Sequence, residues 1–385
     1  MTDRKIKICV VITNPMNLQS LYREQFSYLT ANGFEVTAVS SPGKEHEMIK
    51  SQGVSPVAIN IERNPSPLKD LLSVFRLWLF FVSNRFDVIS VSTPKASLLG
   101  VIAARLSGQK NVVYMIRGRA YENLSGVKRK CYELLDGLIC SLSRKVHSIS
   151  FELANEYVES GLCSEEKMVV LGQGSSNGVD LKRFSMSRYS GEDVREIKSI
   201  VGLEEGFVFL YSGRLRRDKG VNELVSAFLS LQKKVSSNVY LLLVGEYESF
   251  DLLEDETLIA IEECSSIVRL SWSNYVEDYF AIADVFVFPS YREGFGNVAI
   301  EASAMNIPVI AYDVVGCRES VKNDVTGILC NPYSVDELHD AMLRLYEDRE
   351  LRNRLGDSGR ERVLESFSSE VVWDNLIEFY TKNSK

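Results

Sequence analysis

Short apolar runs rich in β-branched residues alternate with longer helix-like stretches, and the whole alternation occurs twice along the chain. In the first half the predicted strands are Lys7–Thr13, Glu35–Ser40, Pro56–Ile61, Asp87–Ser92, Val112–Ile116, Val146–Ser150 and Met168–Leu171. The predicted helices between them are Ser20–Asn32, Leu68–Ser83, Lys95–Ser107, Val127–Leu142 and Glu152–Ser160. The runs are continuously apolar, as in parallel strands buried on both faces. Strands interleaved with helices predict βαβ units and a doubly wound sheet.

The alternation of predicted strands and helices starts again after residues 172–180. This stretch of glycine and small polar residues is typical of a linker or hinge. The later predicted strands are Phe207–Ser212, Val239–Val244, Val268–Leu270, Val285–Pro289, Val309–Tyr312 and Gly327–Cys330, with helices at Val221–Val235, at Tyr275–Ala283 and from Val298. A chain of 385 residues is also too long for one ordinary core. The sequence therefore predicts an α/β protein of two Rossmann-like, doubly wound domains facing across a cleft, where a ligand would bind.

Charge is distributed unevenly between the two halves. The net charge is -8, which argues against nucleic acid as a partner. Residues 1–190 carry 24 Lys and Arg against 17 Asp and Glu, a net charge of +7, and the remainder carries 20 against 35, a net charge of -15. A basic half joined to an acidic half indicates domains that face different partners.

The cysteines and histidines indicate a reducing compartment and no metal site. The seven cysteines form no CxxC pair, and the three histidines lie far apart in the sequence. The first residues lead directly into a strand, so no signal peptide is expected. The apolar run Leu77–Val82 is far shorter than the roughly 20 residues of a spanning helix. A cytoplasmic protein is expected.

Ser212–Gly220, which follows a predicted strand and precedes a helix, is the first candidate site. Gly213 permits a tight turn, Arg214 offers a planar fork to a phosphate, and Lys219 adds a mobile positive charge. With the helix N-terminus, these residues would suit a diphosphate. The alternative is an exposed basic turn that caps the helix.

The second candidate is the segment Glu293–Glu301, which follows the predicted strand Val285–Pro289. Gly294 and Gly296 leave backbone N–H groups open to a ligand near the start of the next helix. Two carboxylates around such a loop suit a ligand with phosphates in the middle and sugars at both ends. The alternative is that Glu293 caps the helix and Glu301 is solvated.

The segment from Glu293-Gly294-Phe295-Gly296-Asn297 to Glu301 resembles the E-x7-E signature of the family 4 retaining glycosyltransferases, which have the GT-B fold. Four further segments match that family in the same order: Gly213–Gly220, Asn177–Asp180 with Phe184, Ala283–Ser290, and the loops around Gly316 and Gly327. Ser92–Ala96 and Arg117-Gly118-Arg119 resemble the branch that builds bacterial capsule, O-antigen and N-glycan precursors on a polyprenyl diphosphate.

The resemblance implies a role for each matching residue. Arg214 and Lys219, with the turn at Gly213, would stabilise the departing nucleotide diphosphate without a metal or another cofactor. Glu301 would hold the ribose and Glu293 the donor sugar. Backbone N–H groups of the loop would contact the sugar and phosphates; its residues are Gly294, Phe295, Gly296 and Asn297. No general base is expected, because in a retaining front-face mechanism the leaving phosphate takes the acceptor proton.

The first half departs from the family pattern at two places. The loop Thr13–Ser20 has no glycine, and Arg117 stands where many members have a histidine that contacts the donor sugar. Arg117 would either take that catalytic position or bind an acceptor phosphate; the alternative is a surface arginine. Lys95 and Arg119 are predicted to bind the acceptor.

Two further segments bear on membrane attachment and domain boundaries. Pro67–Arg85 has an unusually wide apolar arc, which fits either a helix packed against the sheet or one lying in a membrane interface. Because Lys128–Lys130 and Arg144-Lys145 add positive charge, an anionic inner-membrane surface is a predicted partner. In the GT-B fold the final helix, here Ser366–Tyr380, crosses back to the first domain. The predicted domains are residues 1–185 with 366–385, which bind the acceptor, and 186–365, which bind the nucleotide sugar.

The sequence is thus interpreted as a retaining, metal-independent hexosyltransferase, peripheral to the inner face of the cell membrane. It would transfer a hexose or N-acetylhexosamine, from a UDP-sugar on family frequency, to a glycan on a polyprenyl diphosphate. The alternatives are a non-catalytic sugar-nucleotide-binding subunit, a transferase with a soluble acceptor, and a GT-B epimerase or phosphorylase. A nicotinamide-dependent dehydrogenase would need a GxGxxG after the first strand, and Thr13–Ser20 has none.

Overall fold

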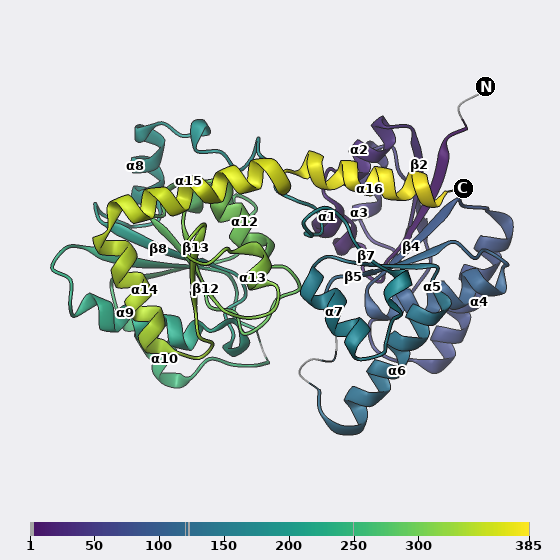
Figure 1. Cartoon of the computed structure of the whole chain (residues 1–385), viewed down its shortest axis with the longest axis horizontal. Helices are drawn as coiled ribbons and strands as arrows, with labels where there is room; N and C mark the ends of the chain where they lie inside the picture. The colour runs from purple at the N-terminus through teal and green to yellow at the C-terminus, as the bar shows by residue number, and fades with distance from the viewer. Residues whose placement is uncertain (1–3, 120, 122–123, 249, 385) are drawn as a thin grey trace. The chain divides into compact units, whose positions relative to one another are not determined.

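A computed structural model describes residues 4–119, 121, 124–248 and 250–384. The chain divides into two compact units, Met1–Gly178 with Ser369–Lys385 and Val179–Ser368 (Figure 1). The predicted boundaries, after residues 185 and 365, lie a few residues from these. Each unit is built around its own parallel sheet, as the doubled strand–helix alternation predicts.

The first unit contains a seven-stranded parallel sheet in the order β3-β2-β1-β4-β5-β6-β7. Its strands are β1 Ile6–Val11, β2 Phe34–Ser40, β3 Ser55–Ala58, β4 Val88–Ser92, β5 Val112–Ile116, β6 Lys145–Ser148 and β7 Met168–Val170. Residues of β1, β4 and β5 are buried along most or all of their length, which explains their unalternating apolar sequence.

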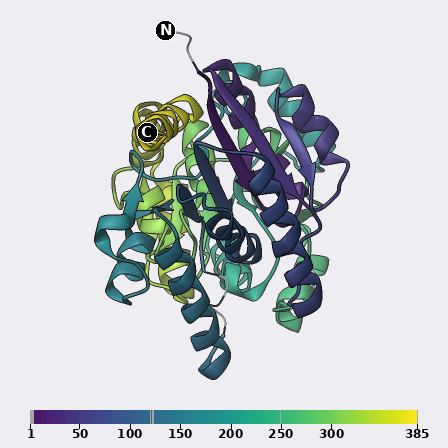
Figure 2. The same cartoon turned by 90° about the vertical axis from the view of Figure 1, so that its right-hand side faces the viewer.

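Helices cover both faces of this sheet, whose strands appear in purple and blue in Figure 2. They are α1 Met16–Tyr22, α2 Gln25–Ala31, α3 Glu45–Ser51, α4 Pro67–Ser83, α5 Pro94–Leu106, α6 Gly126–Leu142, α7 Phe151–Glu159 and α16 Ser369–Asn383. α4, α5 and α6 pack side by side (Figure 1). α16 lies against α2, and its Leu376, Phe379 and Tyr380 join the core formed with β1 and β2.

The second unit contains a six-stranded parallel sheet in the order β10-β9-β8-β11-β12-β13. Its strands are β8 Phe207–Ser212, β9 Val239–Val244, β10 Ile267–Leu270, β11 Val285–Phe288, β12 Val309–Tyr312 and β13 Gly327–Cys330. Its helices are α8 Gly191–Ile200, α9 Val221–Gln232, α10 Asp255–Glu263, α11 Val276–Ala281, α12 Asn297–Ala304, α13 Cys317–Ser320, α14 Val335–Glu347 and α15 Arg349–Ser366. The predicted α/β class with two doubly wound sheets is confirmed.

Both sheets reverse their winding direction between their first and fourth strands, at β1/β4 and at β8/β11. Loops that leave such a pair of strands diverge to opposite faces of the sheet, so a crevice opens beyond their carboxyl ends. The loop after β8 and the loop after β11 are the two segments singled out from the sequence. No helix in the described part of the chain has the length and apolar character needed to cross a bilayer.

Candidate functional site

Four loops meet at the edge of the second unit's sheet where the strands end, and they lie in the same order as the strands that they follow. The backbone N–H of Leu215, after β8, donates to the carbonyl of Glu246, after β9, at 2.9 Å. Tyr291 N–H, after β11, donates to the carbonyl of Asp218 at 3.0 Å, and Glu293 N–H to that of Val315, after β12, at 3.3 Å. The structure therefore brings the two predicted motifs together at the switch point of one sheet.

Two glycines allow these loops to approach each other so closely. Gly220 has a φ of 67°, and a Cβ atom there would lie 2.0 Å from the carbonyl oxygen of Pro289. Gly316 has a φ of 80°, and a Cβ atom there would lie 2.5 Å from the carbonyl oxygen of Glu293. A side chain at either position would separate the loops, because these contacts are with backbone rather than with a flexible side chain.

Lys219 and Glu293, predicted for the diphosphate and the donor sugar respectively, form an ion pair in the structure. Lys219 Nζ lies 2.5 Å from Glu293 Oε1 and donates to Ser290 Oγ at 3.2 Å. The Ser290 side chain is buried and its hydroxyl in turn donates to the carbonyl of Arg292 at 2.9 Å. Sequence reasoning missed Ser290, whose only signal was its place directly after β11.

Arg214 also has an acidic partner, which the sequence analysis did not single out. Its guanidinium donates to Glu248 Oε1 at 3.1 Å, from a side chain that is about half exposed. Glu248 Oε2 accepts from Arg216 at 3.4 Å, and Arg216 also pairs with Asp218. The signal for Glu248 was its position just after β9, the strand next to β8. Acidic side chains thus hold the basic loop in place.

The predicted nucleotide-sugar-binding residues lie around the start of α12. Gly296 is its N-cap, with a φ of 76°, and Asn297 is its first residue. The Phe295 side chain is buried 5.3 Å from the ring of Phe367, so it anchors the loop and leaves only its backbone for a ligand. Glu301 is only 8% exposed and lies near enough to Arg183 for their charges to interact. A solvated Glu301 is therefore wrong.

In the first unit, Arg117 follows β5 directly and is not a surface arginine. All three guanidinium nitrogens are buried without a hydrogen-bond partner among the described residues. The guanidinium carbon lies 5.3 Å from the ring centre of Tyr22, at the end of α1. His147, on the neighbouring β6, is fully enclosed; burial and then the Arg117 charge lower its pKa to about 3.

The other two predicted acceptor residues have carboxylate partners. Lys95 Nζ lies 2.6 Å from Asp70 Oδ1, and an Arg119 nitrogen lies 2.7 Å from Glu156 Oε2. Both side chains are largely buried. Of the three cations predicted for this unit, Arg117 is therefore the one without a carboxylate partner among the described residues.

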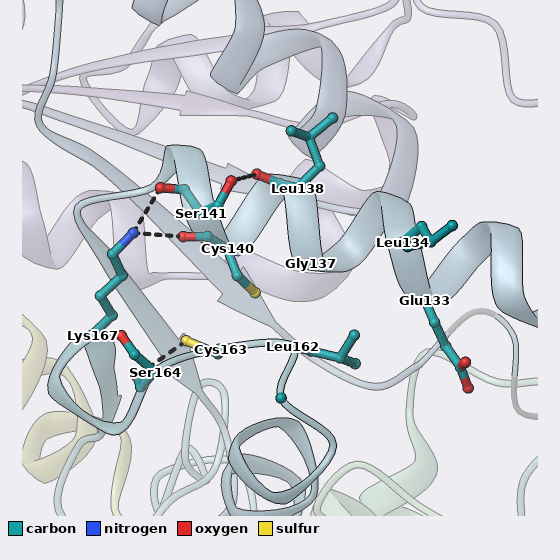
Figure 3. A pocket seen from close by; sticks show the side chains of 11 residues that line it. Glu133, Leu134, Gly137, Leu138, Cys140, Ser141, Leu162, Cys163, Ser164 and Lys167 are labelled. Atoms are coloured by element: carbon teal, nitrogen blue, oxygen red, sulfur yellow. Dashed lines mark hydrogen bonds between the residues drawn. The ribbon is translucent and has the colours of Figure 1, made fainter.

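A separate pocket of about 570 Å³ lies between α6 and the segment Gly161–Lys167, and it contains none of the predicted site residues (Figure 3). Lys167 Nζ donates to the carbonyl oxygens of Cys140, at 3.1 Å, and Ser141, at 2.7 Å, at the end of α6. The Lys167 side chain, which lines this pocket, is therefore already hydrogen-bonded to backbone carbonyls.

The described side chains include no group of three or more His, Cys, Asp or Glu placed to hold a metal ion. Metal independence, predicted from the family resemblance, remains a prediction.

Comparisons with known proteins match both units. Residues 193–362 match the family model described as glycosyl transferases group 1, and residues 21–174 match the glycosyl transferase 4-like domain.

The chain is 31% identical over 380 residues to the capsular polysaccharide biosynthesis glycosyltransferase CapM of Staphylococcus aureus, covering 99% of this chain and 97% of CapM. It is 27% identical to the UDP-Gal:alpha-D-GlcNAc-diphosphoundecaprenol alpha-1,3-galactosyltransferase of Escherichia coli, covering 98% of this chain and 97% of that one. The structure of Anabaena HepE in complex with UDP and glucose superposes with a TM-score of 0.80 at 18% identity, covering 98% of this chain and all of HepE.

Proposed function

Because this chain belongs to the group 1 glycosyltransferases of the GT-B fold, we propose that it moves a hexose or N-acetylhexosamine from a nucleotide-diphospho-sugar to a glycan carried on a polyprenyl diphosphate. The resemblance to family 4 drawn from the motifs is confirmed by matches that span the chain. Relatives named for capsule synthesis and for a diphosphoundecaprenol acceptor support the class of acceptor.

The observation that carries the proposal is the joining of the two motif loops at the β8/β11 switch point. There the basic loop, Arg214 to Lys219, lies beside the loop that starts α12, so positive charge and a helix N-terminus occur together. A basic loop beside a helix N-terminus, at the switch point of a parallel sheet, suits a diphosphate. A bound diphosphate would compete with Glu293 for Lys219 and with Glu248 for Arg214. Glu293, released in this way, would accept hydrogen bonds from the donor sugar.

We expect the charged side chains to stabilise the leaving nucleotide. As the bond from the anomeric carbon to the diphosphate oxygen breaks, negative charge grows on that oxygen, near Arg214 and Lys219. These side chains supply permanent positive charges, which is why a metal ion is not needed in the proposed mechanism. The leaving phosphate takes the acceptor proton, so the sugar enters and leaves on one face and its anomeric configuration is retained. UDP is the favoured nucleotide, in line with the UDP-bound structural neighbour.

The first unit is proposed to receive the acceptor at an anionic inner-membrane surface. One face of α4 exposes the apolar side chains Leu68, Leu71, Leu72, Phe75, Leu79 and Val82, which we call the α4 stripe. Leu68 and Leu71 are 86% and 70% exposed. The helix also packs against α5 and buries Ser73, Leu77 and Phe81, so both expected readings describe part of its surface. The exposed apolar stripe on a basic half supports the proposal of an interfacial helix.

Thermal shift measurements with nucleotides test the donor site. We expect UDP to raise the unfolding temperature more than GDP or dTDP, because a ligand at about 100 times its Kd stabilises by about 2.7 kcal/mol. Arg214→Ala and Lys219→Ala should each remove most of the UDP effect. A response to NAD alone, or to no nucleotide at all, would contradict the proposed function.

A further inference from the structure

We infer that Arg117 is the centre of a second anion site, which takes a diphosphate separate from the donor's. The inference rests on the proposed function, which supplies a diphosphate-linked acceptor, and it names the group in the first unit that binds that diphosphate.

The guanidinium of Arg117 carries a positive charge that nothing in its described surroundings neutralises. Its Nε and both terminal nitrogens are buried without a hydrogen bond, so five N–H donors are unused. Buried arginines are nearly always paired, because removing a charge from water is costly. An unpaired guanidinium at the carboxyl end of a central strand therefore indicates a missing anionic partner.

The neighbours of Arg117 are neutral and partly unsatisfied as well. Tyr22 is 1% exposed, stacks on the guanidinium and has a hydroxyl with no partner among the described residues. His147, 4% exposed, is neutral at pH 7 and leaves Nδ1 without a partner. Tyr380, on α16, lies close enough to interact with both Arg117 and Tyr22. This group of side chains contributes hydrogen-bonding atoms but no negative charge.

The strand register places further polar atoms on the same edge. Ser92 ends β4 and pairs in register with Met115 of β5, which in turn pairs with His147 of β6. The Ser92 hydroxyl is buried and has no partner in the described chain. Arg117 lies two residues beyond Met115. Unsatisfied buried groups are rare in folded proteins, and their concentration here is explained by a bound ligand.

A diphosphate fits this cluster better than a single carboxylate does. The planar guanidinium donates two parallel hydrogen bonds to phosphate oxygens, and its remaining donors need further acceptors, which a second phosphate supplies. Lys95 and Arg119, the other candidate cations of this unit, already hold Asp70 and Glu156. The acceptor diphosphate is therefore centred on Arg117, the one of the three without a described carboxylate partner.

The guanidinium lies against the ring of Tyr22. This residue ends α1 and precedes Arg23, whose φ of 37° interrupts the helix before α2 begins. Binding of a diphosphate would require the Tyr22 ring, which also stacks on Phe26, to move off the guanidinium.

Calorimetric titration of the full chain, saturated with UDP, tests the inference. The probes are geranyl diphosphate, inorganic pyrophosphate and glucuronate, which separate a lipid diphosphate, a free diphosphate and a sugar carboxylate. We expect UDP-saturated protein to bind one further equivalent of geranyl diphosphate. Arg117→Met should weaken that binding at least tenfold and leave UDP affinity unchanged. Arg105→Met, which alters another partly buried arginine of the same unit, should change neither.

Thermal unfolding without ligand provides a second readout. Arg117→Met replaces an unpaired buried charge with an apolar chain of similar length, so its unfolding temperature should equal or exceed that of the wild type. The inference is overturned if geranyl diphosphate fails to bind UDP-saturated protein, if Arg117→Met binds it normally, or if the variant is strongly destabilised. It is also overturned if glucuronate alone shows the Arg117 dependence. Failure of UDP itself to bind the wild type would instead contradict the proposed function.

Discussion

Lys219 and Glu293 neutralise each other's charge at the candidate site. Their side chains are 2.5 Å apart and mostly buried, so each neutralises the other until a ligand separates them. A diphosphate offers Lys219 a doubly negative partner in place of a single carboxylate. The geometry thus couples the two proposed roles, because occupying Lys219 also frees Glu293 for the sugar.

Substitution of these residues should reduce transfer without unfolding the chain. We expect Glu293→Ala, Arg214→Ala and Lys219→Ala each to lower turnover roughly 10²–10³-fold, since a charged transition-state contact contributes on the order of 2–4 kcal/mol. Lys234→Ala, at an exposed position beyond α9, is the control. Initial rates and circular dichroism would be compared, and near-normal turnover in all three variants would refute the assignment.

His147 should make the first unit less stable in mild acid. Its pKa is about 3 in the folded chain and near 6.5 when unfolded, so below pH 6.5 the unfolded chain takes up a proton that the folded chain does not. Stability is therefore complete above pH 6.5 and declines as the pH falls towards 3. From pH 7 to pH 5 this loss is about 2 kcal/mol, at about 1.4 kcal/mol per pH unit.

Hydrogen exchange of peptides from β5 and β6 at the two pH values measures this loss. The variant His147→Gln should lose about 2 kcal/mol less than the wild type over that interval. An identical decline in both proteins would mean that His147 is protonated in the folded chain.

At the scale of elements, sequence patterns predicted the buried strands closely and the polar helices poorly. β5, β8, β9, β12 and β13 begin and end where the sequence predicts, because continuous apolar runs between polar boundaries determine them. The helices α3, α8, α10, α13, α14 and α15 were not predicted, and most of them are rich in charged residues. The predicted helix Ser20–Asn32 is two helices, α1 and α2, because the backbone at Arg23 turns to a positive φ that no sequence signal marked.

In the candidate site, residues within one motif could be predicted from the sequence, whereas residues whose contacts are long-range could not. Motif spacing identified Arg214, Lys219 and Glu293, since each motif lies within one loop. Glu248 and Ser290 were missed because their contacts depend on which strands are neighbours in the sheet. No sequence signal indicated that Arg117 lacks a described counter-charge, because only the folded structure shows which cations form ion pairs.

The α4 stripe should attach the first unit to anionic membranes. Burying each leucine or phenylalanine contributes about 1.5–3 kcal/mol, so Leu71→Glu with Phe75→Glu should lower vesicle binding at least ~10²-fold. Ile259→Glu, at an exposed position on α10 of the second unit, is the matched control. Flotation with phosphatidylglycerol and with neutral vesicles would be compared. No effect of the double variant would exclude docking through this stripe, and equal recovery with both lipids would exclude a preference for anionic membranes.

At the scale of the whole molecule, the two halves differ in net charge and in the ligand that each is proposed to bind. The half with a net charge of +7 contains Arg117 and the α4 stripe, and the half with a net charge of -15 contains the basic loop from Arg214 to Lys219. In the second half, four of the 20 basic residues gather in the loop from Arg214 to Lys219, which has acidic neighbours and so suits a small anion rather than an anionic surface. In the first half positive charge is broad, which suits a lipid acceptor at an anionic bilayer.

The most direct test of the proposed reaction is a transfer assay that determines the product's stereochemistry. The protein would be incubated, in chelator, with a panel of nucleotide sugars and a short polyprenyl-diphosphate-linked glycan, and the product analysed by NMR. We predict one new glycosidic bond with the anomeric configuration of the donor sugar, formed best from a UDP-sugar. An inverted anomer, a requirement for added metal, or transfer only to a soluble acceptor would contradict the account.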